Sequence, residues 1–174
     1  MLTIRPATPA DGPTSLRLIH ELAIYEREPN AVIASEADLL RDGFCCAPDG
    51  TPLDSPARFR ALIAELTEDG TTTPAGFALF FTSYSTWLGH HGIRLEDLYV
   101  TPALRQRGIG KALLARLAQI ALDEGCPRLE WDVLHWNEPA IAVYQRLGAH
   151  ILNDWRIMRL NGDALRALAT NDKT

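Results

Sequence analysis

Several kinds of residue and segment are scarce in this 174-residue chain, and each scarcity excludes a class of protein. Basic residues are outnumbered, because Lys and Arg total 17 against 22 Asp and Glu, which gives a formal net charge of −5. Nucleic-acid-binding proteins usually carry a basic patch that neutralises phosphates, so we expect no nucleic-acid partner. No apolar run approaches the ~18 residues of a membrane-spanning helix, so we expect no membrane association.

Cysteine is also scarce. The chain has three cysteines, of which Cys45 and Cys46 are adjacent and Cys126 stands alone. An odd number without C-x-x-C spacing predicts neither a disulfide framework nor a zinc site. Met1 leads directly into a strand-like stretch, residues 2–5, with no basic-then-apolar leader, so we expect no signal peptide. The reducing cytoplasm is the expected compartment.

The composition that remains is 47% hydrophobic and 22% charged, which is typical of one folded domain, here residues 1–174. Asp11 can cap a first helix, and Ser35 with Asp38 can start a shorter one. Residues 43–56 are rich in proline and glycine and predict a surface loop. The pattern predicts helices at 11–26, 35–40, 108–123 and 139–147, and strands at 2–5, 59–66, 76–83, 93–100, 128–134 and 151–160. This order predicts an α/β (α+β) fold with one mixed, mostly antiparallel central sheet flanked by helices.

The most informative stretch joins the strand ending at Val100 to the long helix. Gly108 and Gly110 stand just before this helix, where glycines allow a tight bend and the close approach of a ligand. The first N–H groups of a helix have no internal partner and, together with the helix dipole, favour a pyrophosphate. Positive charge is added around the same point by Arg105, Arg107 and Lys111.

The residues of this turn allow three further interpretations to be compared with known motifs. A P-loop requires glycine where Arg105 stands and a hydroxyl residue where Ala112 follows Lys111, so we exclude it. The dinucleotide fingerprint requires a third glycine, and Leu113 occupies that position. A glycine turn that merely starts a helix stays open on these residues alone.

The pattern R-x-x-G-x-G after Leu98-Tyr99-Val100 resembles the acetyl-CoA signature of the GCN5-related N-acetyltransferases. Further along, E-W-D-V-L-H-W-N-E-P-A at 130–140, a helix with Tyr144, and then L-G-A resemble the C-terminal half of that fold. With Tyr25-Glu26, the Y-S-T-W of residues 84–87 and Glu96-Asp97, the chain resembles the spermidine/spermine (diamine) acetyltransferases. It is most similar to their thialysine branch, through Y-S-T-W-x-G and A-L-D-x-G-C.

The resemblance covers residues 4–149, with two departures: residues 45–56 are longer, and the segment after Ala149 is shorter, than the family pattern. It implies acetyl-CoA as co-substrate, a small cationic amine as acceptor and a homodimer. It also implies that the loop amides hold the pyrophosphate, that the preceding strand lends backbone groups to the pantetheine arm, and that Asn137 hydrogen-bonds the cofactor. The implied cofactor-binding residues are Leu98, Tyr99, Val100, Arg105, Gln106, Arg107, Gly108, Ile109, Gly110, Lys111 and Asn137.

The chemistry of such a reaction needs a proton acceptor. An alkyl amine has a pKa near ~10.4 and arrives protonated, so a carboxylate must help to remove its proton. Glu96 and Asp97 are adjacent on a predicted strand, where their side chains would point to opposite faces, and one of them facing solvent is the alternative. The resemblance favours Glu96 as the proton acceptor and Asp97 as a ligand of the cation. It assigns Tyr144 as the acid that protonates the departing thiolate.

For the acceptor, Tyr25, Glu26 and Trp87 resemble positions that line the polyamine channel, where carboxylates and ring faces attract ammonium groups. Asp132, together with Glu130, would add negative charge to the channel, although a solvated strand face explains these two equally well. We expect no metal, because the adjacent His90 and His91 of a predicted hairpin turn have no third ligand nearby in the sequence.

Two other functions stay open at this point. One is a protein or peptide N-acetyltransferase, which an open groove at residues 45–56 would favour, because fold alone does not set the acceptor. The other is a non-catalytic sensor that binds acyl-CoA, against which the presence of both Glu96 and Tyr144 argues.

Overall fold

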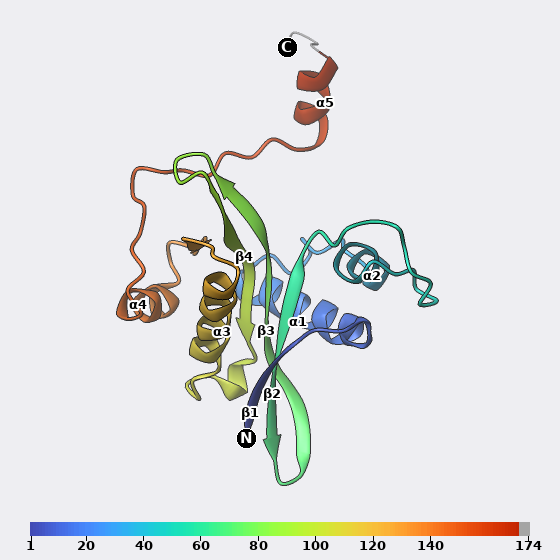
Figure 1. Ribbon diagram of the computed structural model, residues 1–174, viewed down its shortest axis with the longest axis vertical. Helices are drawn as coiled ribbons and strands as arrows, with labels where there is room; N and C mark the ends of the chain where they lie inside the picture. Colours follow the sequence, from blue (N-terminus) through green and yellow to red (C-terminus); the bar gives the residue numbers. More distant parts are fainter. Residues whose placement is uncertain (171–174) are drawn as a thin grey trace. The chain divides into compact units, whose positions relative to one another are not determined.

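The computed structural model describes residues 1–170 of the chain, which separate into two compact units, Met1–Asp132 and a second beginning at Val133. Figure 1 traces the chain through its helices and strands, from blue at the N-terminus to red toward the C-terminus. The expectation of a single domain over residues 1–174 stays a prediction, and its last four residues lie outside the described part of the chain.

The first unit is built on one five-stranded sheet in which the strands follow each other in chain order. Neighbouring strands are antiparallel up to β4, and β4 pairs with β5 in parallel. The sheet is therefore mixed and mostly antiparallel, which confirms the expected fold class. The strands are β1 (Leu2–Pro6), β2 (Arg60–Glu68), β3 (Thr71–Ser85), β4 (His90–Val100) and β5 (Leu129–Trp131).

The helices of this unit are α1 (Gly12–Tyr25), α2 (Glu36–Phe44) and α3 (Ile109–Asp123). The capping box predicted before α2 is confirmed, because Asp38 N–H donates to Ser35 Oγ at 3.3 Å and Ser35 N–H donates to Asp38 Oδ2 at 2.9 Å. Asp11 occupies the N-cap position of α1, but the prediction that its side chain caps the helix is wrong. Its carboxylate instead accepts hydrogen bonds from Arg5 and Thr8, which lie before the helix.

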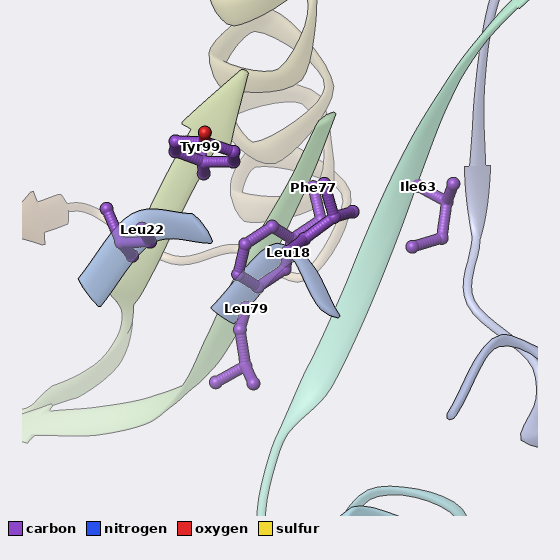
Figure 2. Packing of buried hydrophobic residues seen from close by; sticks show 6 residues of the cluster. All are labelled: Leu18, Leu22, Ile63, Phe77, Leu79 and Tyr99. Atoms are coloured by element: carbon purple, nitrogen blue, oxygen red, sulfur yellow. The ribbon is translucent and has the colours of Figure 1, made fainter. Parts of the chain in front are cut away.

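The two faces of the sheet are covered by different helices. Leu18 and Leu22 of α1 pack against Ile63, Phe77, Leu79 and Tyr99 in one buried cluster (Figure 2). Because successive side chains of a strand alternate, Leu62 and Phe80 lie on the opposite face. There they line a pocket of about 390 Å³ together with Arg116 and Ile120 of α3. Helix α3 therefore covers the face opposite α1.

The second unit contains α4 (Glu138–Arg146) and α5 (Gly162–Thr170). The strand predicted for residues 151–160 is not present, and β5 is shorter than the predicted 128–134. A strand needs a neighbouring backbone to pair with, and the hydrogen bond from Trp155 N–H to Leu152 C=O closes a turn instead. This stretch exposes the large apolar side chains Ile151, Leu152, Trp155, Ile157, Met158 and Leu160.

Across residues 1–170, no helix combines the length and the apolar character that crossing a membrane requires.

Candidate active site

The two acidic residues of β4 lie at an irregularity in the sheet. Asp97 pairs with Leu79 and Leu95 pairs with Phe80, so Glu96 has no partner across β3. Such a bulge breaks the alternation of a strand and re-aims its side chains. The extra residue interrupts the regular alternation of β4 at this point, so the expectation that Glu96 and Asp97 point to opposite faces stays a prediction. Glu96 is exposed and Asp97 is half-buried.

Asp97 is partly buried and is influenced by two other carboxylates. Burial, followed by the carboxylates of Glu96 and Glu26, raises the pKa of Asp97 to about 6. The pKa of Glu26 is raised as well, because its surroundings partly remove it from water. None of the groups that shift the pKa of Asp97 is a cation. The first unit thus gathers Glu26, Glu96 and Asp97 around a place where a positive charge would be stabilised.

The edge of β4 beside β5 is open over its last residues. The parallel pairing of the two strands ends at Leu95 with Trp131. Within residues 1–132, the stretch from Glu96 to Val100 has no strand partner on that side. Backbone groups of Leu98 to Val100 that point to this edge therefore have no strand partner there, and their binding of an extended ligand stays a prediction.

The loop after β4 turns sharply before α3. Gln106 (φ 64°) and Gly108 (φ 77°) both adopt the left-handed conformation, which glycine tolerates without strain. The first helical hydrogen bond runs from Ala112 N–H to Gly108 C=O at 2.9 Å. The N–H groups of residues 109–111 therefore have no acceptor within α3, and this arrangement fits a pyrophosphate.

Open space accompanies these amides. A methyl group added at Gly110 would meet only the side chain of Val100, at the ordinary contact distance of 3.8 Å. Ile109 is 2% exposed and anchors the first turn of the helix in the core. The loop can thus approach a ligand closely while its helix stays fixed.

Two of the three basic side chains of the loop, those of Arg107 and Arg105, already interact with other groups of the protein, which makes them less available to bind an anion than the sequence suggests. Arg107 forms an ion pair with Glu68 at 2.8 Å, with both side chains exposed. Arg105 turns back onto the protein, where its Nε donates to Val100 C=O at 3.0 Å and its guanidinium carbon lies 4.5 Å from the centre of the Tyr25 ring. Lys111 is exposed in the first turn of α3. The backbone amides at the start of α3 and the exposed Lys111 are therefore the candidate anion-binding groups of this loop.

The residues expected to bind the acceptor are placed differently from one another. Tyr25 ends α1, packs against the core cluster and is followed by Glu26 as the C-cap. Trp87 lies in the β3–β4 turn of residues 86–89 and is 88% exposed. Asp132 forms an ion pair with Arg94, and Glu130 forms one with Arg128 at 3.1 Å. The charge that these two acids would lend to a channel is therefore largely balanced.

The histidine pair is not in a turn. His90 and His91 are the first residues of β4, and their rings stack with centroids 4.5 Å apart, so the predicted hairpin turn lies before them at 86–89. Nowhere in the described part of the chain do three or more His, Cys, Asp or Glu side chains gather in a group able to hold a metal ion.

The remaining candidates lie in the second unit. Asn137 is the N-cap of α4, and Tyr144 lies within that helix, both half-buried. The structure thus brings together Tyr25, Glu26, Glu96, Asp97 and Arg105 in the first unit and places Asn137 and Tyr144 in the second.

Two residues that support this site escaped the sequence analysis. A side chain at Gly76 would come within 2.4 Å of Tyr99 C=O, so only glycine lets β3 approach the end of β4 there. Glu21 interacts with the Tyr99 hydroxyl. Glu21 precedes Tyr25 by four residues on α1, so helical spacing alone could have linked the two.

Residues 25–149 match the family model described as the acetyltransferase (GNAT) family. The chain belongs to this family. The matched region contains β4, the glycine turn, α3 and the helix with Tyr144. GNAT enzymes use acetyl-CoA, and the chain is an acetyl-CoA-dependent N-acetyltransferase that acts on an amine.

Several GNAT relatives match over nearly the whole chain. The bovine (Bos taurus) thialysine N-epsilon-acetyltransferase is 40% identical over 173 residues, which cover 95% of this chain and 96% of that protein. The L-ornithine N5-acetyltransferase of Arabidopsis thaliana is 32% identical over 200 aligned residues, covering 95% and 86%. An integron cassette protein from the mobile metagenome of V. cholerae shares the fold, with a TM-score of 0.72, 24% identity and 97% coverage of each chain.

Proposed function

We propose that the enzyme acetylates the primary amine of a small cationic acceptor, a diamine, a polyamine or a side chain such as that of thialysine or lysine. The observation that carries this proposal is the group of three carboxylates, Glu26, Glu96 and Asp97, without a cation among the groups that shift the pKa of Asp97. A half-buried carboxylate beside other carboxylates is stabilised by an incoming ammonium group. Relatives named for thialysine and ornithine support the same class of acceptor.

Acetyl-CoA supplies the acetyl group as a reactive thioester. The unpaired amides at the start of α3 and the open space at Gly110 fit its pyrophosphate. We propose that the loop from Arg105 to Lys111 holds the pyrophosphate, with backbone groups of Leu98, Tyr99 and Val100 along the arm and Asn137 as a further hydrogen-bonding group. A backbone N–H of this strand end would polarise the thioester oxygen.

The proposed roles of the acids follow from their exposure. Glu96 is exposed and can accept the ammonium proton directly or through water, whereas half-buried Asp97 is better placed to hold the cation. Glu26, Tyr25 and Trp87 would complete the acceptor site, and Asp132 would contribute only on release from Arg94. Tyr144 would return a proton to the departing thiolate.

The proposal is tested by thiol release from acetyl-CoA with spermidine, short diamines, ornithine, lysine, thialysine and a lysine peptide. Turnover with a small diamine or amino acid, and little with the peptide, is the expected result. Preference for the peptide would make the enzyme a protein acetyltransferase instead. Binding of acetyl-CoA without release of thiol in the presence of any acceptor would favour a sensor.

The catalytic assignments are tested with Glu96→Gln and Tyr144→Phe. General acid and base groups contribute about 10²–10⁴-fold to a rate, so each variant should lose at least about 100-fold in kcat with little change in acetyl-CoA binding. Loss of binding without a loss of kcat would remove the residue from the chemistry.

We further propose that both units work as one N-acetyltransferase domain in a homodimer. The family match from residue 25 to 149 crosses the boundary between the units, which supports a joint function. The three cysteines are unpaired thiols, which supports a reducing compartment such as the cytoplasm.

A further inference from the structure

The side chain of Arg105 contacts groups from elements outside its own loop. Its Nε donates to the carbonyl at the end of β4, Val100 C=O, at 3.0 Å. Its guanidinium carbon lies 4.5 Å from the centre of the Tyr25 ring and 5.7 Å from that of Tyr99. A guanidinium over aromatic faces is held by both electrostatic attraction and stacking. Arg105 thus joins the last residue of α1 to the last residues of β4.

The guanidinium of Arg105 also has a polar neighbour inside the protein, the hydroxyl of Tyr99. Tyr99 is 4% exposed, and its hydroxyl interacts with both the Glu21 carboxylate and the Arg105 guanidinium. Glu21 also forms an ion pair with Arg17 one turn earlier on α1. An arginine that binds a phosphate directs its donors to the ligand, whereas the Nε of Arg105 is directed to a backbone carbonyl.

The contact with Tyr25 bears on the acceptor side of the site. Glu26 follows Tyr25 directly, and its N–H donates to Leu22 C=O at 2.8 Å, which closes the helix. Arg27 (φ 69°) then turns the chain away. The position of the Glu26 carboxylate, one of the two acids that act on Asp97, therefore depends on where the Tyr25 ring is held.

We infer that Arg105 is a positioning residue for the acceptor: it fastens the end of α1, with Tyr25 and Glu26, to the end of the strand that borders the cofactor. This inference rests on the proposed function, and it gives the arginine a different task from the backbone amides of its loop. Lysine cannot reproduce it, because an ammonium group lacks both the planar stacking surface and the Nε donor.

A comparison of two acetyl donors distinguishes this positioning role from binding of the pyrophosphate. Acetyl-CoA carries a pyrophosphate and S-acetylpantetheine does not. If Arg105 positions the acceptor site, Arg105→Gln raises the KM of the preferred amine by about ten-fold with either donor and changes the KM of acetyl-CoA by less than about two-fold. If Arg105 binds the pyrophosphate, the KM of acetyl-CoA rises, kinetics with S-acetylpantetheine stay unchanged, and the inference is overturned.

A double-mutant cycle tests whether the effect passes through the ring. In the background of Tyr25→Leu, replacing Arg105 should add less than about two-fold to the KM of the amine. Full additivity of the two changes would contradict the inference. Arg105→Lys retains the charge and should behave like Arg105→Gln, so a rescue by lysine would also contradict it.

Three controls distinguish failure of this inference from a general effect of substitution, from unfolding and from failure of the proposed function. Arg41→Lys changes an exposed arginine of α2 that pairs with Asp38 and Asp42, and it should alter none of these constants. Circular dichroism checks that each variant is folded. If Arg105→Gln is unfolded, acetyl-CoA and S-acetylpantetheine are compared with the Arg105→Lys variant instead. An unmutated enzyme that released no thiol with any amine would refute the proposed function itself, before any variant is compared.

Discussion

At the scale of one residue, Asp97 is the central carboxylate of the proposed acceptor site. Its pKa of about 6 arises from burial first and from Glu96 and Glu26 second. Binding of an ammonium group requires the ionised carboxylate. We therefore expect kcat/KM for the amine to fall as the pH drops below about 6, and we expect Glu26→Gln to move this limb to lower pH, because it removes a charge that raises the pKa of Asp97. A pH–rate profile of both proteins measures the shift.

The same pKa has a consequence for stability. The folded carboxyl titrates near 6 and its ordinary value is 3.8, so between these values the folded protein binds more protons than the unfolded chain. The free energy of unfolding then decreases as the pH rises through this window, and the penalty is complete above it. Asp97→Asn should raise the free energy of unfolding by about 1–3 kcal/mol near pH 8, less near pH 4, and reduce activity. Urea denaturation at the two pH values, with Asp54→Asn as the exposed control, tests this; a destabilised Asp97→Asn would contradict it.

Asp11 is the opposite case, a carboxylate held by partners. Arg5, which lies 2.8 Å away, lowers the pKa of Asp11 to about 2, with further help from Thr8. The stability that it contributes is present above about pH 4 and is lost as the pH falls toward 2. Asp11→Ala should lower the free energy of unfolding by about 2–4 kcal/mol at neutral pH, since it leaves Arg5 and the Thr8 N–H without this acceptor.

A matched control for Asp11 is available on the surface. Glu68 pairs with Arg107, with both side chains about half exposed. Glu68→Ala should change the free energy of unfolding by less than about 1 kcal/mol, because exposed ion pairs contribute little. Chemical denaturation of both variants provides the comparison. Equal losses of unfolding free energy would show that the partly buried interactions of Asp11 stabilise the protein no more than the exposed ion pair does.

At the scale of the elements, two glycines near the end of β4 have different tasks. Gly76→Ala would place a methyl group 2.4 Å from Tyr99 C=O, so it should lower the free energy of unfolding by more than about 2 kcal/mol. Gly110→Ala causes no steric clash in α3 and should raise the free energy of unfolding by about 0.5–1 kcal/mol. The same change should weaken the binding of acetyl-CoA. Thermal unfolding and calorimetric titration separate the two effects. Unchanged acetyl-CoA binding by the Gly110 variant would argue against close approach of the ligand there.

The elements also show how far the sequence predicts this molecule. The sequence alone predicts the glycine turn, the long helix after it and the capping box of Ser35, because each depends on residues close together in the chain. It does not predict the bulge at Glu96 or the fold-back of Arg105 onto Tyr25, because both depend on strands and side chains that only the folded sheet brings near. The stretch 151–160 has strand-like residues but no strand, since the pairing that a strand requires lies outside its own sequence.

At the scale of the whole molecule, the exposed apolar residues of 151–160 bear on the proposed homodimer. Large exposed apolar surfaces commonly mark interfaces, and a second copy of the chain is the proposed partner. We expect a mass of about 38 kDa by light scattering, twice the 19.2 kDa of one chain. Met158 is 91% exposed, so Met158→Asp should leave the fold intact but shift the mass toward the monomer. A monomeric unmutated protein would refute the proposal.

The group of acids formed by Glu26, Glu96 and Asp97 also bears on the release of product in the proposed reaction. An ammonium group that enters relieves the mutual repulsion of Glu26, Glu96 and Asp97. Acetylation turns that ammonium group into a neutral amide, which no longer balances the carboxylates. The acetylated nitrogen is therefore no longer attracted by these carboxylates once the amide has formed. The loss of this attraction would favour release of the product after each turnover and weaken inhibition by accumulated product.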